Sequence, residues 1–446
     1  METLQSAACG GVVKKLVIMT SLGVSILASD ALAIDLAIKG TASESLAASN
    51  NYFLSSNPSG YTAQSTTTGA LNALARTLTT DYSLNAFGSY FKYFGPGAVD
   101  TFPVWGTPAN ANFGIVHTEQ LTTYNVGISW TRADTAQTQF AQTGLHTATA
   151  RGSISSYTAN AGVAHDLSRI DALTWNTIAS TTSFSDSTQF PSRDLTTTLA
   201  WNHVLSPTTT MSTFVSFDWF SVDDPQESQR LFWKSMFGIT SSLSPRLNFN
   251  AHFGWGFANS YQNAPGTLPT GVPPGAFVPQ VGAGNSFLGD MSLTYRLLKT
   301  TAISLTAAQS IVPIFNGQLQ KSEQIGLTLT HGINRLSNLT LSAAFSYVPA
   351  APASSTIGLG QSSPSKFFSI SANYGYQLAQ HWHTNLSYTY NQRNDSTGTV
   401  GASTVLATLV YDFTLLGTSN AINKAQAERA KARAQQSIGY IFPGFH

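Results

Sequence analysis

A two-residue alternation of apolar with small or polar side chains repeats along most of this chain. In residues 247–257, every second residue is apolar or aromatic, from Leu247 to Phe257, and the residues between are asparagine, histidine or glycine. Alternate side chains of a β-strand point to opposite faces. The same pattern recurs in residues 338–347 and 385–391. The sequence therefore predicts many β-strands, each with one apolar face and one small or polar face.

Such strands suit a transmembrane β-barrel, with lipid outside and water inside, or a secreted array of β-sandwiches. Charged residues make up 10% of the 446 residues, against roughly 25% in ordinary soluble domains. Disorder does not explain this depletion, because 11% of the residues are aromatic and 42% are hydrophobic. The net charge of +1 gives no indication of nucleic-acid binding. No linker or change of composition divides the chain, so one all-β barrel is the favoured fold.

The first 33 residues have the features of a secretory signal peptide. Lys14 and Lys15 precede a mostly apolar segment, residues 16–28, and Ala31 and Ala33 supply the small-x-small cleavage pattern. We expect cleavage after Ala33. The single cysteine, Cys9, precedes the apolar segment, so the mature chain has no cysteine and no disulfide. Beyond the signal, no apolar run approaches the roughly 20 residues that a membrane helix needs.

Short segments that share a central leucine or isoleucine recur at intervals and predict tight turns between paired strands. The central residues are Leu167, Leu205, Leu243, Leu297, Ile333 and Leu378, with looser matches near Leu78 and Leu121. Serine, asparagine, proline and arginine in these segments suit type I turns. Eight turns join sixteen strands. A first strand near residues 34–46 and a last near residues 403–416 raise the count to about 18, with sixteen as the alternative.

The connections between these hairpins are longer. They are predicted at residues 96–108, 133–150, 261–284, 349–364 and 391–401. Long loops at one end and short turns at the other are typical of outer-membrane barrels, whose short turns face the periplasm.

The position two residues before each central residue predicts an interfacial girdle. Each residue there shares the apolar parity of its strand, and all but one have a ring: His165, His203, Ser241, Tyr295, His331 and Tyr376. Rings at the turn end of the lipid face belong at the level of the lipid headgroups.

Parity also predicts the lining of the barrel. Inward positions are mostly serine, threonine, asparagine, glutamine, glycine and alanine, which indicates a lumen with few charges. The candidate lumen charges are Asp218, Asp290, Arg296 and Asp412, with Glu323 as an additional candidate. They either keep the lumen hydrated, neutralise one another or form a selectivity ring.

Together these features resemble a Gram-negative outer-membrane β-barrel of porin-like size, over residues 34–416. The Leu-Ser-Pro turns are also similar to those of uncharacterised outer-membrane barrels associated with exopolysaccharide export. The resemblance implies an aromatic-x-aromatic signal for the barrel-insertion machinery in the last strand, which Tyr411 and Phe413 match. The chain departs from that pattern because it continues beyond this strand and has Thr408 where a glycine is usual.

Residues 421–436 are rich in alanine and charged residues and predict a helix. Its basic residues are Lys424, Arg429, Lys431 and Arg433, and strand polarity assigns residues 418–446 to the periplasm. This segment is interpreted as a solvated tail, a plug, or a contact with a periplasmic protein or an anionic polymer.

The leading hypothesis is an outer-membrane channel through which small polar or saccharide-like solutes diffuse, with outer-membrane lipid as its surroundings. The alternative is a structural or assembly barrel of an exopolysaccharide export system. A barrel hydrolase is the third hypothesis, with His252 as its candidate residue. No nucleophile–base set, metal-ligand spacing or cofactor loop is visible in the sequence, so we expect no enzyme activity, metal or cofactor.

Overall fold

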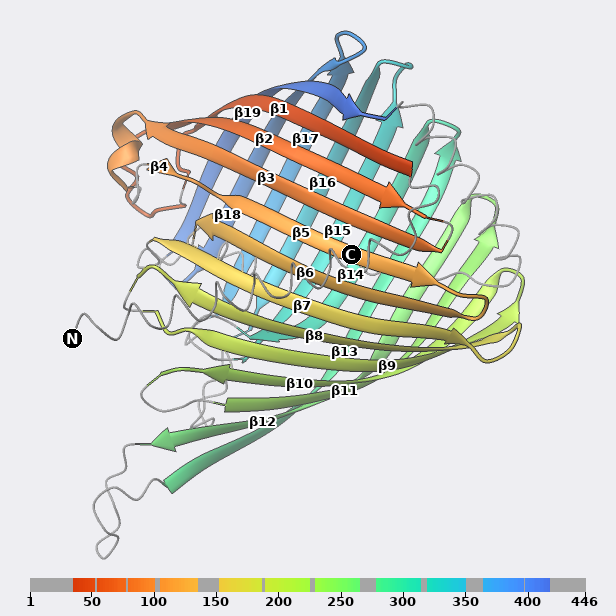
Figure 1. Cartoon of the computed structure of the whole chain (residues 1–446). Helices are drawn as coiled ribbons and strands as arrows, with labels where there is room; N and C mark the ends of the chain where they lie inside the picture. The colour runs from red at the N-terminus through yellow and green to blue at the C-terminus, as the bar shows by residue number, and fades with distance from the viewer. Residues whose placement is uncertain are drawn as a thin grey trace, which may run out of the picture.

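The computed structural model describes most of residues 35–417 as one antiparallel sheet (Figure 1). The residues outside this description are 1–34, 53, 78, 101–104, 135–151, 187–188, 225–228, 265–277, 314–318, 350–363, 397 and 418–446. The predicted signal peptide and the predicted periplasmic helix, with Lys424, Arg429, Lys431 and Arg433, therefore lie outside the described residues.

The strands follow one another along the chain with hardly any helix between them. Their bounds are β1 (Asp35–Ser49), β2 (Thr62–Arg76), β3 (Thr80–Phe94), β4 (Trp105–Gly106), β5 (Ala109–Thr118), β6 (Thr122–Asp134), β7 (Ser153–Asp166), β8 (Asp171–Phe184), β9 (Ser192–Ser206), β10 (Thr209–Val222), β11 (Gln229–Ser244), β12 (Leu247–Ala264), β13 (Val278–Leu298), β14 (Thr301–Pro313), β15 (Leu319–Gly332), β16 (Ser337–Val348), β17 (Ser365–Gln377), β18 (Trp382–Asp395) and β19 (Gly398–Leu416). A 3-10 helix, η1 (Pro96–Asp100), follows β3.

The sheet closes on itself. Apart from β4 and β5, strands that follow one another along the chain pair antiparallel, and β19 pairs with β1 from Leu416 opposite Ile38 to Thr404 opposite Ser49. The short β4 and the longer β5 both pair with β3, and Pro108, which lacks an N–H donor, lies between them. They form one interrupted strand, so the chain is a closed antiparallel up-and-down barrel of 18 strands. The prediction of 18 strands is confirmed.

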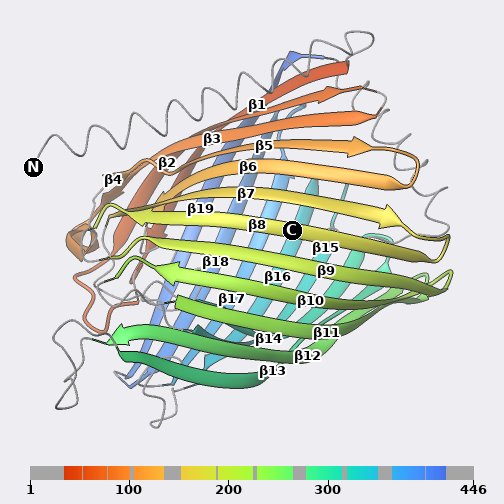
Figure 2. The ribbon, with the colours of Figure 1, turned by 60° about the horizontal axis from the view of Figure 1, so that its bottom comes forward.

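All eight predicted tight turns lie at one end of the barrel (Figure 2). The start of β1 and the end of β19 lie at the same end. The β9–β10 and β11–β12 turns leave two residues between strands, and Leu167 and Ile333 begin slightly longer turns. The Leu167 N–H donates a hydrogen bond to the Asp171 carbonyl at 2.9 Å, and the Ile333 N–H donates one to the Ser337 carbonyl at 3.1 Å. These bonds satisfy the backbone where the ladder ends.

The connections at the other end differ in part from the prediction. Strands β12 and β13 extend into the loop predicted at residues 261–284, ending at Ala264 and restarting at Val278. The loop predicted at residues 391–401 is a tight connection, because β18 ends at Asp395 and β19 begins at Gly398. Gly398 has a φ of 119°, a conformation that glycine adopts without steric cost. Strand β18 continues through the polar residues Asn391 and Asn394 because their backbones pair with Ser369 and Lys366 of β17. The polarity of the side chains gives no sign of this backbone pairing.

The outer surface has the predicted apolar face. Cross-strand partners share a face, and the outward rows on β11, β12 and β13 bring aromatic residues together. Phe253, Trp255 and Phe257 are 49%, 54% and 53% exposed. An apolar outside on a closed barrel, whose first and last strands pair with each other, is the structure of an outer-membrane barrel. In the described part of the chain, no helix is long and apolar enough to cross a membrane.

The seam between the first and last strands depends on a glycine. Phe413 lies on the outer face of β19 opposite Gly40 of β1, and a Cβ on Gly40 would come within 2.3 Å of the Phe413 ring. The ring of Tyr411 stacks on Phe413, with centroids 6.1 Å apart, and lies 4.8 Å from the ring of Trp382. The residues predicted to form the insertion signal thus lie on the outer face at the closing seam.

We predict that Gly40→Leu destabilises the closed barrel by about 1–3 kcal/mol, the usual cost of overpacking a close contact. The measurement is the fraction of protein that migrates as a compact barrel in gel electrophoresis without heating, after refolding over a urea series. Gly88→Leu is the matched control, because a Cβ there meets nothing within 4 Å. Equal behaviour of the two variants would contradict this account of the seam.

Candidate functional site

The structure places the predicted lumen charges on different parts of the inner wall. Asp218 and Asp290 face inward on β10 and β13, opposite Phe232 and His252 of the neighbouring strands. Arg296 has the same parity as Asp290 and lies near the turn end. Asp412 faces inward on β19, where its carboxylate lies 3.3 Å from Nδ1 of His383.

The additional candidate, Glu323, is on the other face. It pairs with Gln309 and Tyr347 and shares the outward face with Ile325, and its carboxylate forms an ion pair with Lys321 at 2.9 Å. Glu323 is thus not a lumen charge. Parity is hard to assign here from sequence because apolar residues are sparse on both faces around residue 321.

The predicted girdle residues lie on the outer face at the turn end. Each pairs with the first residue of the strand that precedes it in the sheet: His165 with Thr122, His203 with Asp171, Tyr295 with Leu247, His331 with Thr301 and Tyr376 with Ser337. In the three histidine pairs, Nδ1 lies 2.8–2.9 Å from the partner oxygen. His117 makes the same contact with Thr80, at 2.8 Å. The sequence analysis did not predict the pair of His117 and Thr80. A serine or threonine at the first position of the neighbouring strand could have indicated such a pair.

Hydroxyl groups pair across the strands over much of the inner wall. The pairs are Ser45 with Thr408, Thr68 with Ser89, Ser156 with Thr182, Thr198 with Ser216, Thr294 with Ser304 and Thr328 with Ser342, at 2.8–3.4 Å. Each hydroxyl can both donate and accept, so these rows present polar groups to water or to a solute. They give the lumen its general hydrophilic character.

The inner faces of β9 to β13, called here the β9–β13 wall, are different because they gather charged groups. Thr196 Oγ1 lies 3.2 Å from a carboxylate oxygen of Asp194 and 3.3 Å from one of Asp218, which links the two acids. On the next strand, Lys234 is the cross-strand partner of Ser216, one inward position from Asp218. Arg230 faces the same side and is 3% exposed. Both signs of charge therefore lie within a few strands.

The same wall contains an apolar cluster. Phe232, Met236, Ala258 and Leu288 are each less than a tenth exposed and pack together, with Phe214 and Ile311 against them. Glycines on β12 make this packing possible. A Cβ on Gly256 would come within 2.7 Å of the Phe232 ring and 2.8 Å of Leu288. Because β12 has no side chain there, residues of the two flanking strands meet above it.

A histidine–carboxylate pair lies beside this cluster. His252 Nδ1 and Asp290 Oδ2 are 2.9 Å apart, and the His252 ring makes an edge contact with Phe214 at a centroid distance of 5.9 Å. The ring lies over Gly238, whose absent Cβ would come within 2.1 Å of it. Sequence alone could not find this pair, because Asp290 and His252 are 38 residues apart.

Ser212 completes an inward row of Ser212, Gly238, His252 and Asp290 on four adjacent strands. Its Oγ lies 2.4 Å, and His252 Nε2 2.8 Å, from the position of the absent Gly238 Cβ. Backbone N–H groups of these central strands are used in the ladders, so the row offers no backbone oxyanion hole. The described residues include no group of three metal-ligating side chains.

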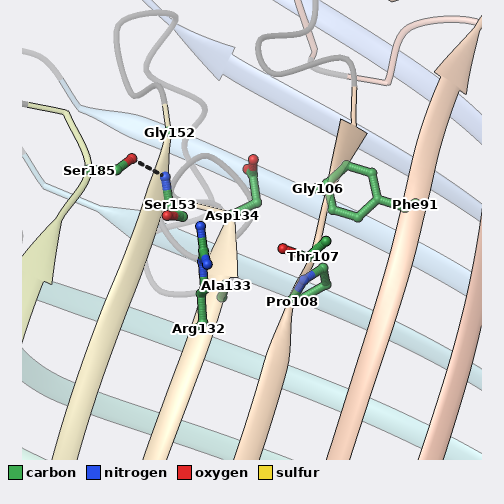
Figure 3. Close-up of a pocket in the computed structure, with 10 residues that line it drawn as sticks. All are labelled: Phe91, Gly106, Thr107, Pro108, Arg132, Ala133, Asp134, Gly152, Ser153 and Ser185. Atoms are coloured by element: carbon green, nitrogen blue, oxygen red, sulfur yellow. Dashed lines mark hydrogen bonds between the residues drawn. The ribbon is translucent and has the colours of Figure 1, made fainter.

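A pocket of about 240 Å³ lies at the long-loop end, where β3, β5, β6 and β7 end (Figure 3). The side chains of Phe91, Thr107 and Arg132 line it, and the N–H of Ser153 donates a hydrogen bond to Ser185 Oγ at 2.8 Å. Ligand sites usually have volumes of roughly 300–1,000 Å³. The pocket is thus small, and the β9–β13 wall is the better candidate site.

Comparison with known proteins yields likenesses of shape. No protein-family model and no curated protein matches the chain. Among solved structures, Acinetobacter baumannii OccAB4 is 12% identical and has a TM-score of 0.46, covering 85% of this chain and 98% of its own. The Pseudomonas aeruginosa outer membrane protein opdK is 9% identical, with a TM-score of 0.44 and coverages of 85% and 99%. The copper transporter OprC is 11% identical, with a TM-score of 0.48 and coverages of 81% and 63%. At these TM-scores the fold of the present chain rests on its own strand ladders.

We predict that changing Asp194 and Asp218 together to asparagine lowers the K⁺/Cl⁻ permeability ratio by roughly twofold or more, because it removes negative charge from the inner wall. The ratio is obtained from reversal potentials in a KCl gradient at pH 8. Asp171→Asn is the control, because Asp171 lies on the outer face of the turn end. A ratio that changes equally in both variants would contradict the inward placement.

The hydrogen bond between Thr301 and His331 should contribute about 1 kcal/mol to folding, as a typical net hydrogen bond does. Thr301→Val and His331→Phe, alone and together, form a double-mutant cycle in urea unfolding from lipid vesicles. A coupling energy near zero would show that the contact does not hold the turn end. Ser337 and Tyr376 occupy the equivalent positions one hairpin further along. They provide a cycle in which no side-chain hydrogen bond is expected.

Proposed function

We propose that this chain is a channel of a Gram-negative outer membrane through which small polar or saccharide-like solutes diffuse. The supporting observation is the closed barrel of 18 strands, with an apolar exterior and hydroxyl-rich rows inside. A barrel of 16–18 strands generally leaves an aqueous channel. The chain therefore has the architecture that such a function needs. No covalent step is part of the proposal.

The β9–β13 wall provides a site at which a passing solute binds transiently. Carboxylates of Asp194 and Asp218 accept hydrogen bonds from hydroxyl or amino groups, and Lys234 donates them. Phe214 and Ile311, which are partly buried and pack against the cluster around Phe232, offer an apolar surface. Solutes with one polar and one apolar face, such as sugar rings, match both parts. The remaining hydroxyl rows let such solutes pass without strong charge preference.

The test is the swelling of liposomes that contain the refolded mature chain, in solutions of neutral sugars of increasing size and of matched charged solutes. We expect small neutral sugars and charged compounds of similar size to enter at similar rates, and entry to slow as the sugar becomes larger. Replacing Phe214 with alanine should speed passage of sugars that bind transiently at this apolar surface and leave glycerol entry unchanged. Phe253→Ala, on the outer face, is the control.

Entry rates no faster than those of protein-free liposomes would contradict the channel proposal. Sugar entry that is unaffected by Phe214→Ala would retain the channel and remove the β9–β13 wall from its solute path.

A further inference from the structure

A part of the outer surface consists mostly of small and polar residues. On β1, β2 and β3, three rows of outward partners form a grid: Ala42, Gly69 and Gly88; Glu44, Thr67 and Tyr90; Leu46, Ser65 and Lys92. We name these nine residues the β1–β3 outer face. It combines small residues, hydroxyl groups and two opposite charges that form no ion pair with each other.

Glu44 is exposed on the outer face of β1, nine residues from the first residue of the strand and five from the last. Ser65 Oγ donates to Oε1 of Glu44 at 2.7 Å, and Thr67 Oγ1 donates to Oε2. Among the described residues no salt bridge neutralises Glu44. A carboxylate facing lipid is unfavourable, and such residues generally mark a contact.

The face also has both a hollow and projections. A hollow of about 390 Å³ lies at Ala42, Leu71, Ala86 and the Phe413 ring, and Gly69 and Gly88 leave it unfilled, since a Cβ on either would meet nothing within 4 Å. Beside the hollow project Leu46 and Tyr90, which are 62% and 49% exposed. Projections next to a hollow make a surface that fits a copy of itself.

The charges point to the same partner. Glu44 lies on β1 and Lys92 on β3, at the two flanks of the face, and the Lys92 ammonium lies 5.4 Å from the centre of the Phe94 ring. A two-fold axis parallel to the barrel and passing through β2 sets β1 of one copy against β3 of the other. Glu44 of each copy then lies opposite Lys92 of the other copy, so the symmetric interface contains two such charge pairs.

We propose that two copies of this chain associate in the membrane through the β1–β3 outer face. This inference depends on the barrel lying in a membrane, and it is independent of solute passage. A lipid molecule in the hollow would leave Glu44 without an opposite charge, whereas a second copy supplies one.

Cysteine cross-linking tests the contact directly, because the mature chain after residue 33 has no cysteine of its own. Thr67→Cys places a thiol at the centre of the grid, close to the proposed axis. Ser235→Cys, on the outer face of β11 between aromatic rows, is the matched control. After mild oxidation in lipid vesicles, we expect a disulfide-linked dimer from Thr67→Cys at least tenfold more abundant than from Ser235→Cys. Equal or absent cross-linking at both positions would overturn the proposal.

Charge reversal separates this contact from random collision. In nanodiscs large enough for two barrels, Glu44→Lys or Lys92→Glu should lower the dimer-to-monomer ratio at least fivefold, and the two together should restore it to within twofold. Migration of unheated protein as a compact barrel shows that each variant folds. A wild-type chain that stays monomeric, or a dimer insensitive to both reversals, would overturn the proposal. Liposome swelling by the same variants is expected to be unchanged, which keeps this test distinct from that of the channel.

Discussion

The requirement that every backbone polar group be paired within the membrane determines the rest of this structure. A lipid environment offers no hydrogen-bond partners, so a sheet crossing it must have no free edge. Here β1 pairs with β19 through most of its length, and the seam closes where the Phe413 ring lies over Gly40. Once the sheet is closed, the two-residue period of the strands divides the side chains between lipid and lumen. The number of strands then determines how wide the lumen is.

Inside the barrel, the same alternation creates two kinds of wall. Hydroxyl pairs such as Thr198 with Ser216 present polar groups on the inner surface. The β9–β13 wall departs from this pattern because glycines on β12 let residues from β11 and β13 meet above it. Phe232 and Leu288 pack over Gly256, and His252 lies over Gly238. The wall thus gains a packed apolar cluster beside Asp218 and Lys234.

Much of the fold could be predicted from the sequence, because it depends on local periodicity and on turn residues. The eight tight turns, the count of 18 strands and the inward direction of Asp218 and Asp290 all follow from those signals. The ends of the long connections could not be predicted, since strands β12 and β13 continue beyond the barrel by pairing with each other through Asn259 and Ala283. Glu323 was misplaced as a lumen candidate because its neighbours lack clear alternation.

The candidate site depends on contacts between residues that are far apart in the sequence. Less of it could therefore be predicted from the sequence than of the fold. His252 was noticed as an inward residue, but its partner Asp290 and the glycine beneath its ring come from other strands. Thr80 and His117 show the same limit at the turn end. The functions of Lys424, Arg429 and the rest of the basic C-terminal segment stay predictions, as does the absence of enzyme activity.

The most direct test of the central claim, that this barrel is a channel, is the single-channel conductance of the refolded, detergent-purified mature chain in a planar bilayer. The account predicts discrete conductance steps, with only weak preference between cations and anions and with dose-dependent block by neutral sugars. The contradicting result is an absence of conductance from protein that runs as a compact barrel and inserts into the bilayer. Such silence would show that this closed barrel does not conduct.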